Sequence, residues 1–231
     1  MLLKKLTSTC TILLFTALTS LGQNKSQPMV WMEAWGKVNI SEKVSALALI
    51  HHRIFLDKDQ TYQDIYWLSG DYKFGKNVSI GGGLMYFTYH KAVGEGFEFV
   101  PETRPFQYII YRPSIGKVKF RIRAMVEERY MSDVVNNEID PLERFNMRYR
   151  FRVRANIPLV NKFSLELSNE LLFNGQQLEA EVFGQNRARG LVCYKVTEKI
   201  GVSAGYLQWT VNTSKGIEQR PSAFFGANYK F

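Results

Sequence analysis

Residues 145–154 read Phe-Asn-Met-Arg-Tyr-Arg-Phe-Arg-Val-Arg, and this stretch decides the fold. Every second residue is apolar or aromatic, and the residues between them are one Asn and four Arg. Successive side chains of a β-strand point to opposite faces, whereas a helix would spread this pattern around its circumference. The stretch therefore predicts a strand with one apolar face and one strongly cationic face.

The same alternation recurs along most of the chain, and it predicts eleven strands and no helix. It is clear in 118–130, 163–173 and the last residues, 225–231, and weaker in 30–39, 44–55, 62–74, 78–90, 104–112, 183–196 and 200–211. Each run has about the 9–11 residues that a tilted strand needs to cross a bilayer. We therefore expect an all-β protein, a transmembrane antiparallel up-and-down β-barrel of about 10–12 strands.

The N-terminus has the pattern of a secretory signal peptide. Lys4 and Lys5 precede an uncharged, mostly apolar stretch, and small residues at positions 20 and 22 predict cleavage after Gly22. Residues 1–22 would then be removed, and residues 23–231 would form the outer-membrane barrel domain. The alternative, a membrane anchor helix, is less favoured because the apolar stretch is short for a span.

The amino-acid composition excludes several classes of protein. The chain has 231 residues, 45% of them hydrophobic and 22% charged, with a formal net charge of +9, so it is not disordered. Its two cysteines, Cys10 and Cys193, cannot build a disulfide framework or a thiolate metal cage. Because the arginines are confined to one face of strands in an exported protein, the positive charge does not indicate nucleic-acid binding.

The predicted connections alternate in length, which is typical of a bacterial outer-membrane barrel. Short turns at 40–43, 74–77, 114–117, 159–162 and 197–199 carry lysines, while longer, more acidic connections span 56–61, 91–102, 132–143, 174–181 and 212–220. An odd strand number is unusual for such barrels. Three interpretations stay open: a split or missed edge strand, an N-terminal segment threading the lumen, or first and last strands that pair in parallel.

A membrane barrel and a soluble, lipocalin-like barrel differ in which face of each strand points outward. In a membrane barrel the apolar face points to lipid, and in a soluble barrel it points into the interior. We expect the apolar face to meet lipid, because aromatic residues gather near strand ends as an interfacial girdle. These are Tyr130, Phe145, Phe173, Tyr194, Trp209 and Tyr229. The terminal residue, Phe231, ends an amphipathic strand that resembles the signal read by the barrel-insertion machinery.

On this assignment the charged faces line the lumen and form a network. Its predicted members are Arg121, Arg123, Glu127, Arg129, Arg148, Arg150, Arg152, Arg154, Glu166, Glu170, Arg187 and Arg189, with Arg53, Arg112 and Glu33 as further candidates. Arginine suits such a site because its planar fork bonds carboxylates in pairs. Two functions remain: a rigid Arg–Glu filling, or a narrow anion-selective channel for small acidic solutes.

An enzyme is a weaker hypothesis. A lipid hydrolase or acyltransferase would need a base from among His51, His52 and His90, and no serine is placed beside them by spacing. We expect His51 in the lumen and His52 toward lipid. Gly81-Gly82-Gly83 lies inside a predicted strand and indicates close packing or a bend, not a phosphate loop. We therefore predict no catalytic residues, no metal and no cofactor.

Several motifs together resemble a known family. They are Val30-Trp31-Met32-Glu33, Phe106-Gln107, Phe120-Arg121-Ile122-Arg123 with Glu127-Glu128-Arg129, Arg148-Tyr149-Arg150-Phe151-Arg152, Asn169-Glu170-Leu171-Leu172-Phe173-Asn174, Gln185-Asn186-Arg187 and Gly205-Tyr206-Leu207. In order and spacing the chain resembles domain of unknown function 2490, a family of uncharacterised outer-membrane barrels. The resemblance implies a barrel in the outer membrane of a Gram-negative bacterium, with no known activity.

The expected partners follow from this location. They are outer-membrane lipid, the insertion machinery during biogenesis and an unidentified envelope protein, for which the acidic long connections would be the contact surface.

Overall fold

The computed structural model describes residues 25–57, 60–94, 96–136, 138–175, 182–213 and 216–231. The predicted signal peptide, residues 1–22, lies outside these residues, as do Glu179 and Glu181 of the predicted connection 174–181. Among the described residues, no helix has the length and apolar character to cross a membrane.

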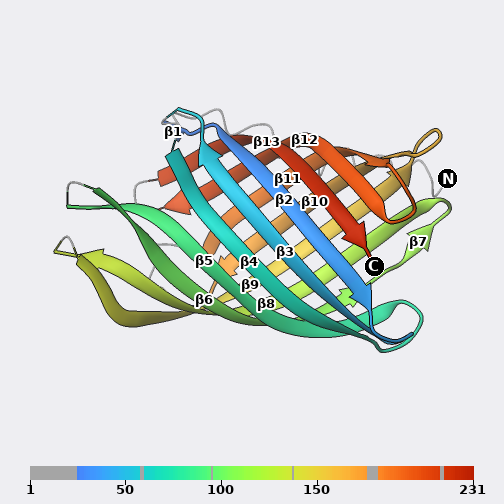
Figure 1. The fold of residues 1–231 in the computed structure, drawn as a ribbon, viewed down its shortest axis with the longest axis horizontal. Helices are drawn as coiled ribbons and strands as arrows, with labels where there is room; N and C mark the ends of the chain where they lie inside the picture. Colours follow the sequence, from blue (N-terminus) through green and yellow to red (C-terminus); the bar gives the residue numbers. More distant parts are fainter. Residues whose placement is uncertain (1–24, 58–59, 95, 137, 176–181, 214–215) are drawn as a thin grey trace.

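Eleven long strands form a closed barrel (Figure 1). They are β2 (Met29–Asn39), β3 (Val44–Phe55), β4 (Gln60–Lys73), β5 (Val78–Val93), β6 (Gly96–Tyr111), β8 (Val118–Val135), β9 (Glu138–Pro158), β10 (Phe163–Asn174), β11 (Phe183–Lys195), β12 (Ile200–Thr213) and β13 (Gly216–Lys230). Two short strands, β1 (Lys25–Ser26) and β7 (Ser114–Ile115), pair with β13 and β8. The prediction of eleven strands in an all-β barrel is confirmed.

The barrel closes through a parallel pair. Strand β13 lies beside β2 with Ser222 opposite Met29 and Lys230 opposite Lys37, whereas the other neighbours among the eleven long strands are antiparallel. This follows from parity, because consecutive antiparallel strands alternate in direction and the first and eleventh must run the same way. Of the three interpretations of the odd count, parallel closure is confirmed, and the expectation of a wholly antiparallel barrel is wrong.

Three of the predicted long connections are largely strand. Strands β5 and β6 continue to Val93 and Gly96, β8 and β9 to Val135 and Glu138, and β12 and β13 to Thr213 and Gly216. Backbone pairing continues there although the side-chain pattern weakens, since ladder hydrogen bonds do not need an apolar face. The expectation of long loops at 91–102, 132–143 and 212–220 is therefore wrong.

The two ends of the barrel differ. The long β5–β6 and β8–β9 hairpins protrude at one end, which we call the hairpin end, and turns such as 40–43 and 159–162 mark the other, the short-turn end (Figure 1). The chain finishes at the short-turn end, where the Phe231 amide donates a hydrogen bond to the Lys37 carbonyl at 3.0 Å.

An ion-pair cluster joins the two protruding hairpins. Asp133 of β8 accepts a hydrogen bond from Lys91 Nζ at 3.0 Å and lies 3.2 Å from Arg144 Nη1 of β9. Burial raises the pKa of Asp133, but the hydrogen bonds from the Val134 amide and Lys91 outweigh it and hold the pKa below its ordinary value. The hairpin end is thus braced between neighbouring strands.

The outward face of the barrel is apolar around its circumference. One apolar residue that is at least half exposed can be named on each of β3, β4, β6, β11 and β13: Ile50, Leu68, Ile109, Val192 and Phe225. Charged and polar side chains such as Arg53, Glu127 and Arg148 are instead buried inside. Trp209 is a correction to the predicted girdle: with Leu207 and Val211 it belongs to the inward face of β12, where it is buried.

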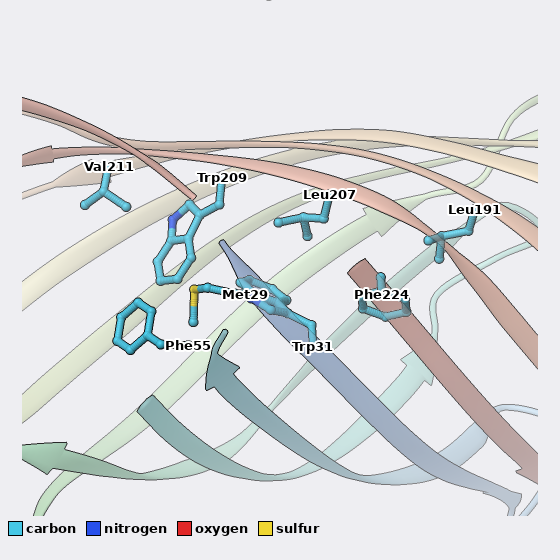
Figure 2. Close-up of a cluster of buried hydrophobic side chains, with 8 residues drawn as sticks. All are labelled: Met29, Trp31, Phe55, Leu191, Leu207, Trp209, Val211 and Phe224. Carbon is cyan, nitrogen blue, oxygen red and sulfur yellow. The ribbon is translucent and has the colours of Figure 1, made fainter. Parts of the chain in front are cut away.

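Part of the inner wall is apolar as well. One cluster includes Trp31, Trp209 and Phe224 near the parallel closure (Figure 2). A second cluster lies on β4, β5, β6 and β8 and includes Met85, Phe106 and Met125. The predicted Arg/Glu lining therefore covers one side of the interior, and these two clusters fill much of the rest.

The glycine run on β5 packs closely against its neighbours, in agreement with the sequence prediction. A Cβ on Gly83 would lie 2.0 Å from the Leu68 carbonyl oxygen, and one on Gly81 would meet the Tyr108 ring. Gly70 of β4, by contrast, has open space where its Cβ would be.

Gly83→Ala should therefore lower the thermal unfolding midpoint of the detergent-solubilised barrel, because strand β4 would have to move away to accommodate the methyl group. Gly70→Ala, on the strand beside it, is the matched control and should leave the midpoint within about 2 °C. Circular dichroism melts of both variants measure this difference. Equal melts for the two variants would contradict the close approach.

Candidate functional site: the charged interior

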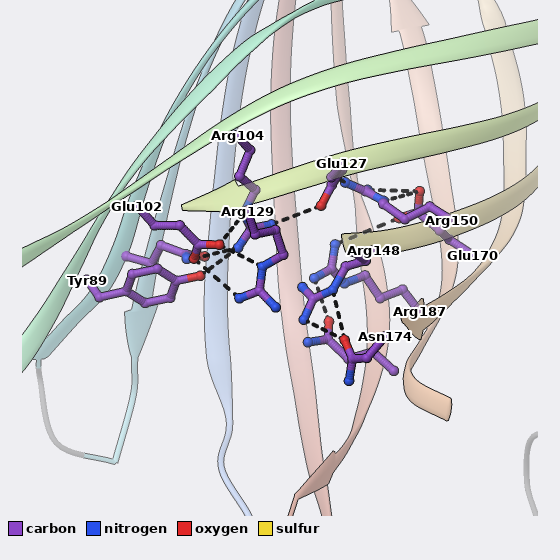
Figure 3. A network of polar contacts seen from close by, with 12 residues as sticks. Tyr89, Glu102, Arg104, Glu127, Arg129, Arg148, Arg150, Glu170, Asn174 and Arg187 are labelled. Atoms are coloured by element: carbon purple, nitrogen blue, oxygen red, sulfur yellow. Dashed lines mark hydrogen bonds and ion pairs between the residues drawn. The ribbon is translucent and has the colours of Figure 1, made fainter. Parts of the chain in front are cut away.

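Two carboxylates lie at the centre of the interior network (Figure 3). Glu127 of β8 is 0% exposed; it accepts a hydrogen bond from Arg104 Nη1 at 3.2 Å and a second from Arg150 Nη1. Glu170 of β10 accepts bonds from Arg150 Nη2 at 2.8 Å and Arg123 Nη2 at 2.7 Å. Arg150 therefore links the two carboxylates, and each carboxylate bonds two guanidinium groups.

The register explains this arrangement. Strands β8, β9 and β10 are consecutive, with Met125 opposite Arg150 and Glu170 opposite Arg152. The long side chain of Arg150 reaches diagonally to carboxylates on both neighbours, because inward residues two apart on adjacent strands are within reach. Its planar fork provides enough donors for both.

A second branch extends toward the hairpin end. Glu102 of β6 receives a two-pronged contact from Arg104, with Nε at 2.7 Å and Nη2 at 2.8 Å, and Arg129 Nε donates to it at 2.6 Å. Arg104 Nη2 also donates to the Tyr89 hydroxyl at 2.9 Å. Both Glu102 and Arg104 were missed in the sequence analysis. They lie at every second position along β6 and face inward on the same side as Phe106 and Tyr108.

A third branch extends toward the short-turn end around Glu166 of β10. Arg154 Nη1 donates to it at 3.1 Å, Arg189 makes a shorter bond, and Arg152 Nη2 lies 3.8 Å away. Charge-assisted contacts of this kind are the strong ones in a protein interior. Three cations therefore share one carboxylate at this level of the barrel.

The structure places all twelve predicted network residues on the inner side of the wall, but they do not form one uniform lattice. Arg148 donates to Asn174 Oδ1 through Nη2 at 3.2 Å and Nε at 3.3 Å. Arg187 lies 3.7 Å from Glu170. Arg121 makes no hydrogen bond or ion pair with any described residue.

Aromatic rings complete the interior beside the parallel closure. The Arg53 guanidinium lies 3.8 Å from the Trp31 ring centroid and 5.4 Å from that of Trp209, and it donates to Gln63 Oε1 at 2.5 Å. Arg104 lies 3.7 Å above the Phe87 ring. Such cation–π contacts stabilise desolvated guanidinium groups, at Arg53 beside an amide acceptor and at Arg104 in addition to its carboxylate bonds.

Two cavities lie inside the described part of the barrel. One of about 810 Å³ reaches the short-turn end, and another of about 530 Å³ reaches the hairpin end. Four residues line both: Arg53, Phe87, Arg104 and Arg187. We call these four residues the septum, and the Glu127 and Glu170 contacts lie beside it.

The histidines occupy different faces. His51 is buried inside, with its ring 4.9 Å from that of Trp31, as the sequence predicts. His52 lies on the outer wall with Nδ1 2.5 Å from Asp64 Oδ1, and His90 Nε2 is 3.7 Å from Asp64 Oδ2. An Asp-oriented imidazole can act as a base, but within the described residues no serine or cysteine hydroxyl or thiol bonds to it.

These features define a class: a closed β-barrel with an apolar exterior and an interior that combines arginine–carboxylate pairs with aromatic clusters. The model of the family described as protein of unknown function (DUF2490) matches residues 29–220, so the chain belongs to that family. No curated protein and no solved structure matches the chain. The match covers every long strand except the end of β13.

Removing the central carboxylate should show what the network contributes to stability. Glu127→Gln leaves Arg104 and Arg150 short of a counter-charge in a buried site, so we expect the free energy of unfolding to fall by about 3–5 kcal/mol. The matched control, Glu128→Gln, changes the next residue of the same strand, whose side chain faces outward, and should cost less than about 0.5 kcal/mol. Urea unfolding of the refolded barrel measures both.

Equal losses for the two variants would show that the interior pairs contribute no more than a surface charge.

Proposed function

We propose that this chain is an exported outer-membrane β-barrel of a Gram-negative bacterium, non-enzymatic, with a lumen closed at its septum. The observation that carries the proposal is the inverted polarity of the wall: residues such as Leu68, 63% exposed, face outward, and Glu127 is fully buried inside. A water-soluble monomer rarely exposes so continuous an apolar surface. Lipid is the solvent that such an exterior fits.

The closed ladder supports the same location. A sheet in hydrocarbon must leave no backbone edge unpaired, because each unbonded amide or carbonyl group costs several kcal/mol there. The β13–β2 pairing removes the edge that an open eleven-stranded sheet would have. Outer-membrane lipid is therefore the main partner we propose, with the barrel-insertion machinery acting during biogenesis.

The interior supports a closed barrel rather than an open channel. Arg150 joins carboxylates of β8 and β10, Arg104 joins Glu127 and Glu102, and the Phe87 ring packs against Arg104. Ions passing this level would have to displace hydrogen bonds at buried charges, which is costly in a medium of low dielectric. We therefore favour a structural role, alone or with an envelope partner, over anion passage.

An outward charge provides the sharpest test of the membrane location. Leu68 of β4 lies between Ala48 and Leu84 on its neighbours, and in a bilayer Leu68→Arg should destabilise the barrel by about 2–4 kcal/mol. Phe97→Arg is the control, because Phe97 is equally exposed but lies near the tip of the β5–β6 hairpin. Folding yield into liposomes, read by gel mobility, compares the two.

If the barrel is water-soluble, Leu68→Arg and Phe97→Arg should fold with equal yield, and the mature chain should stay dissolved without detergent. That result would overturn the proposed location.

Planar-bilayer recordings separate the closed barrel from the channel. Inserted wild-type protein in a KCl gradient should give no stable conductance steps, since the septum residues and the Glu127 network block the passage. Steps with a reversal potential that indicates anion selectivity would instead support the alternative, a channel for small acidic solutes. The empty bilayer and a known porin serve as the negative and positive controls.

A further inference from the structure

The cavity at the short-turn end has far more positive than negative charge. Sixteen Lys and Arg side chains line it, against five Asp and Glu. The network accounts for the cations near the septum, but those nearer the short-turn end have few partners. Among the described residues, Lys37, Lys119 and Arg121 make no ion pair, and the Arg112 guanidinium donates only to the Ser79 hydroxyl.

Arg121 has unfavourable electrostatic surroundings. It lies directly opposite Arg154 in the β8–β9 pair, and the next inward pair, Arg123 opposite Arg152, is also two arginines. Like charges directly opposite each other destabilise a sheet. The strongest electrostatic neighbours of Arg121 are three arginines, Arg154, Arg123 and Arg112, against the single carboxylate of Asp71.

Folding alone does not favour this arrangement. Arg154 and Arg123 bond Glu166 and Glu170, whereas Arg121 bonds no described residue and still projects into the cavity. Residues that lower the stability of the fold and make no stabilising contact are typical of binding sites. The cavity volume of about 810 Å³ is within the range of small-molecule sites.

We propose that the short-turn cavity is a blind vestibule that binds a small multivalent oxyanion, one with at least two phosphate or carboxylate groups, at Arg121, Arg154 and Arg112. Guanidinium forks match both kinds of group geometrically, and the low-dielectric walls of a cleft focus the positive potential on the ligand. The inference deepens the proposed closed barrel, since the septum makes the cavity a dead end rather than a passage.

Isothermal titration of the detergent-solubilised mature chain tests this, with pyrophosphate and citrate as the two probes. We expect one probe to bind with one molecule per barrel, with an affinity that weakens as NaCl is raised. Arg121→Gln should weaken binding about tenfold or more. Lys76→Gln removes a charge from the 74–77 turn at the same end, outside the cavity lining, and should bind like the wild type.

A thermal melt without ligand distinguishes binding from structure. Because Arg121 has no bonding partner and faces other arginines, Arg121→Gln should melt at the wild-type temperature or above it. The proposal is overturned if neither probe binds, if Arg121→Gln binds as tightly as the wild type, or if Arg121→Gln lowers the melting temperature. A conducting barrel that still binds one probe would refute the closed lumen and leave this site standing.

Discussion

Guanidinium–carboxylate bonding across the interior is the interaction on which the rest of this barrel depends. An apolar exterior requires that the polar half of every alternating strand point inward, and here that half is rich in arginine. Buried charges are tolerated only when they are paired and hydrogen-bonded. Glu102, Glu127, Glu166 and Glu170 meet that requirement because each accepts bonds from at least two arginines.

The parallel pairing of β13 with β2 is a second constraint on the interior, beside the guanidinium–carboxylate bonding. An eleven-stranded antiparallel meander can close only by pairing two strands of the same direction, and the β13–β2 register places Trp31 and Phe224 side by side on the inner wall. The aromatic cluster gathers at this seam, where Arg53 packs on the Trp31 ring and Arg187 on the Trp209 ring. The interior thus has an ionic side on β8–β10 and an aromatic side at the closure.

Alternation made much of this predictable from the sequence. Residues 145–154 carry charge at every second position, so the strand, its inward face and the nearness of Glu127 and Glu170 all follow from a period of two. Glu102 and Arg104 were missed because β6 is apolar on both faces beyond them, with Phe106 and Tyr108 inside and Ile109 outside. Trp209 was misassigned for the same reason: on β12 the inward face is apolar.

Other features depend on information that side-chain patterns do not contain. The lengths of the β5–β6 and β8–β9 hairpins are set by backbone pairing, which continues beyond the apolar belt wherever the two strands stay in register. Parallel closure was one of three interpretations, since the sequence gives strand number only to within one or two. Which side chains an arginine bonds depends on diagonal reach between strands, so the bond between Arg148 and Asn174 was not foreseeable.

The arginines of the interior have different partners at the two ends of the barrel axis. Around Glu102 and Glu127 the arginines contact carboxylates or aromatic rings, and this is the level at which we propose that the lumen is closed. Around Arg121 the cations face one another across β8 and β9, and Glu166 and Glu170, the carboxylates of the network beside them, are already bonded to other arginines. A barrel selected only for rigidity would gain from a neutral side chain at Arg121, and the surplus charge therefore supports the proposed anion site in the short-turn cavity.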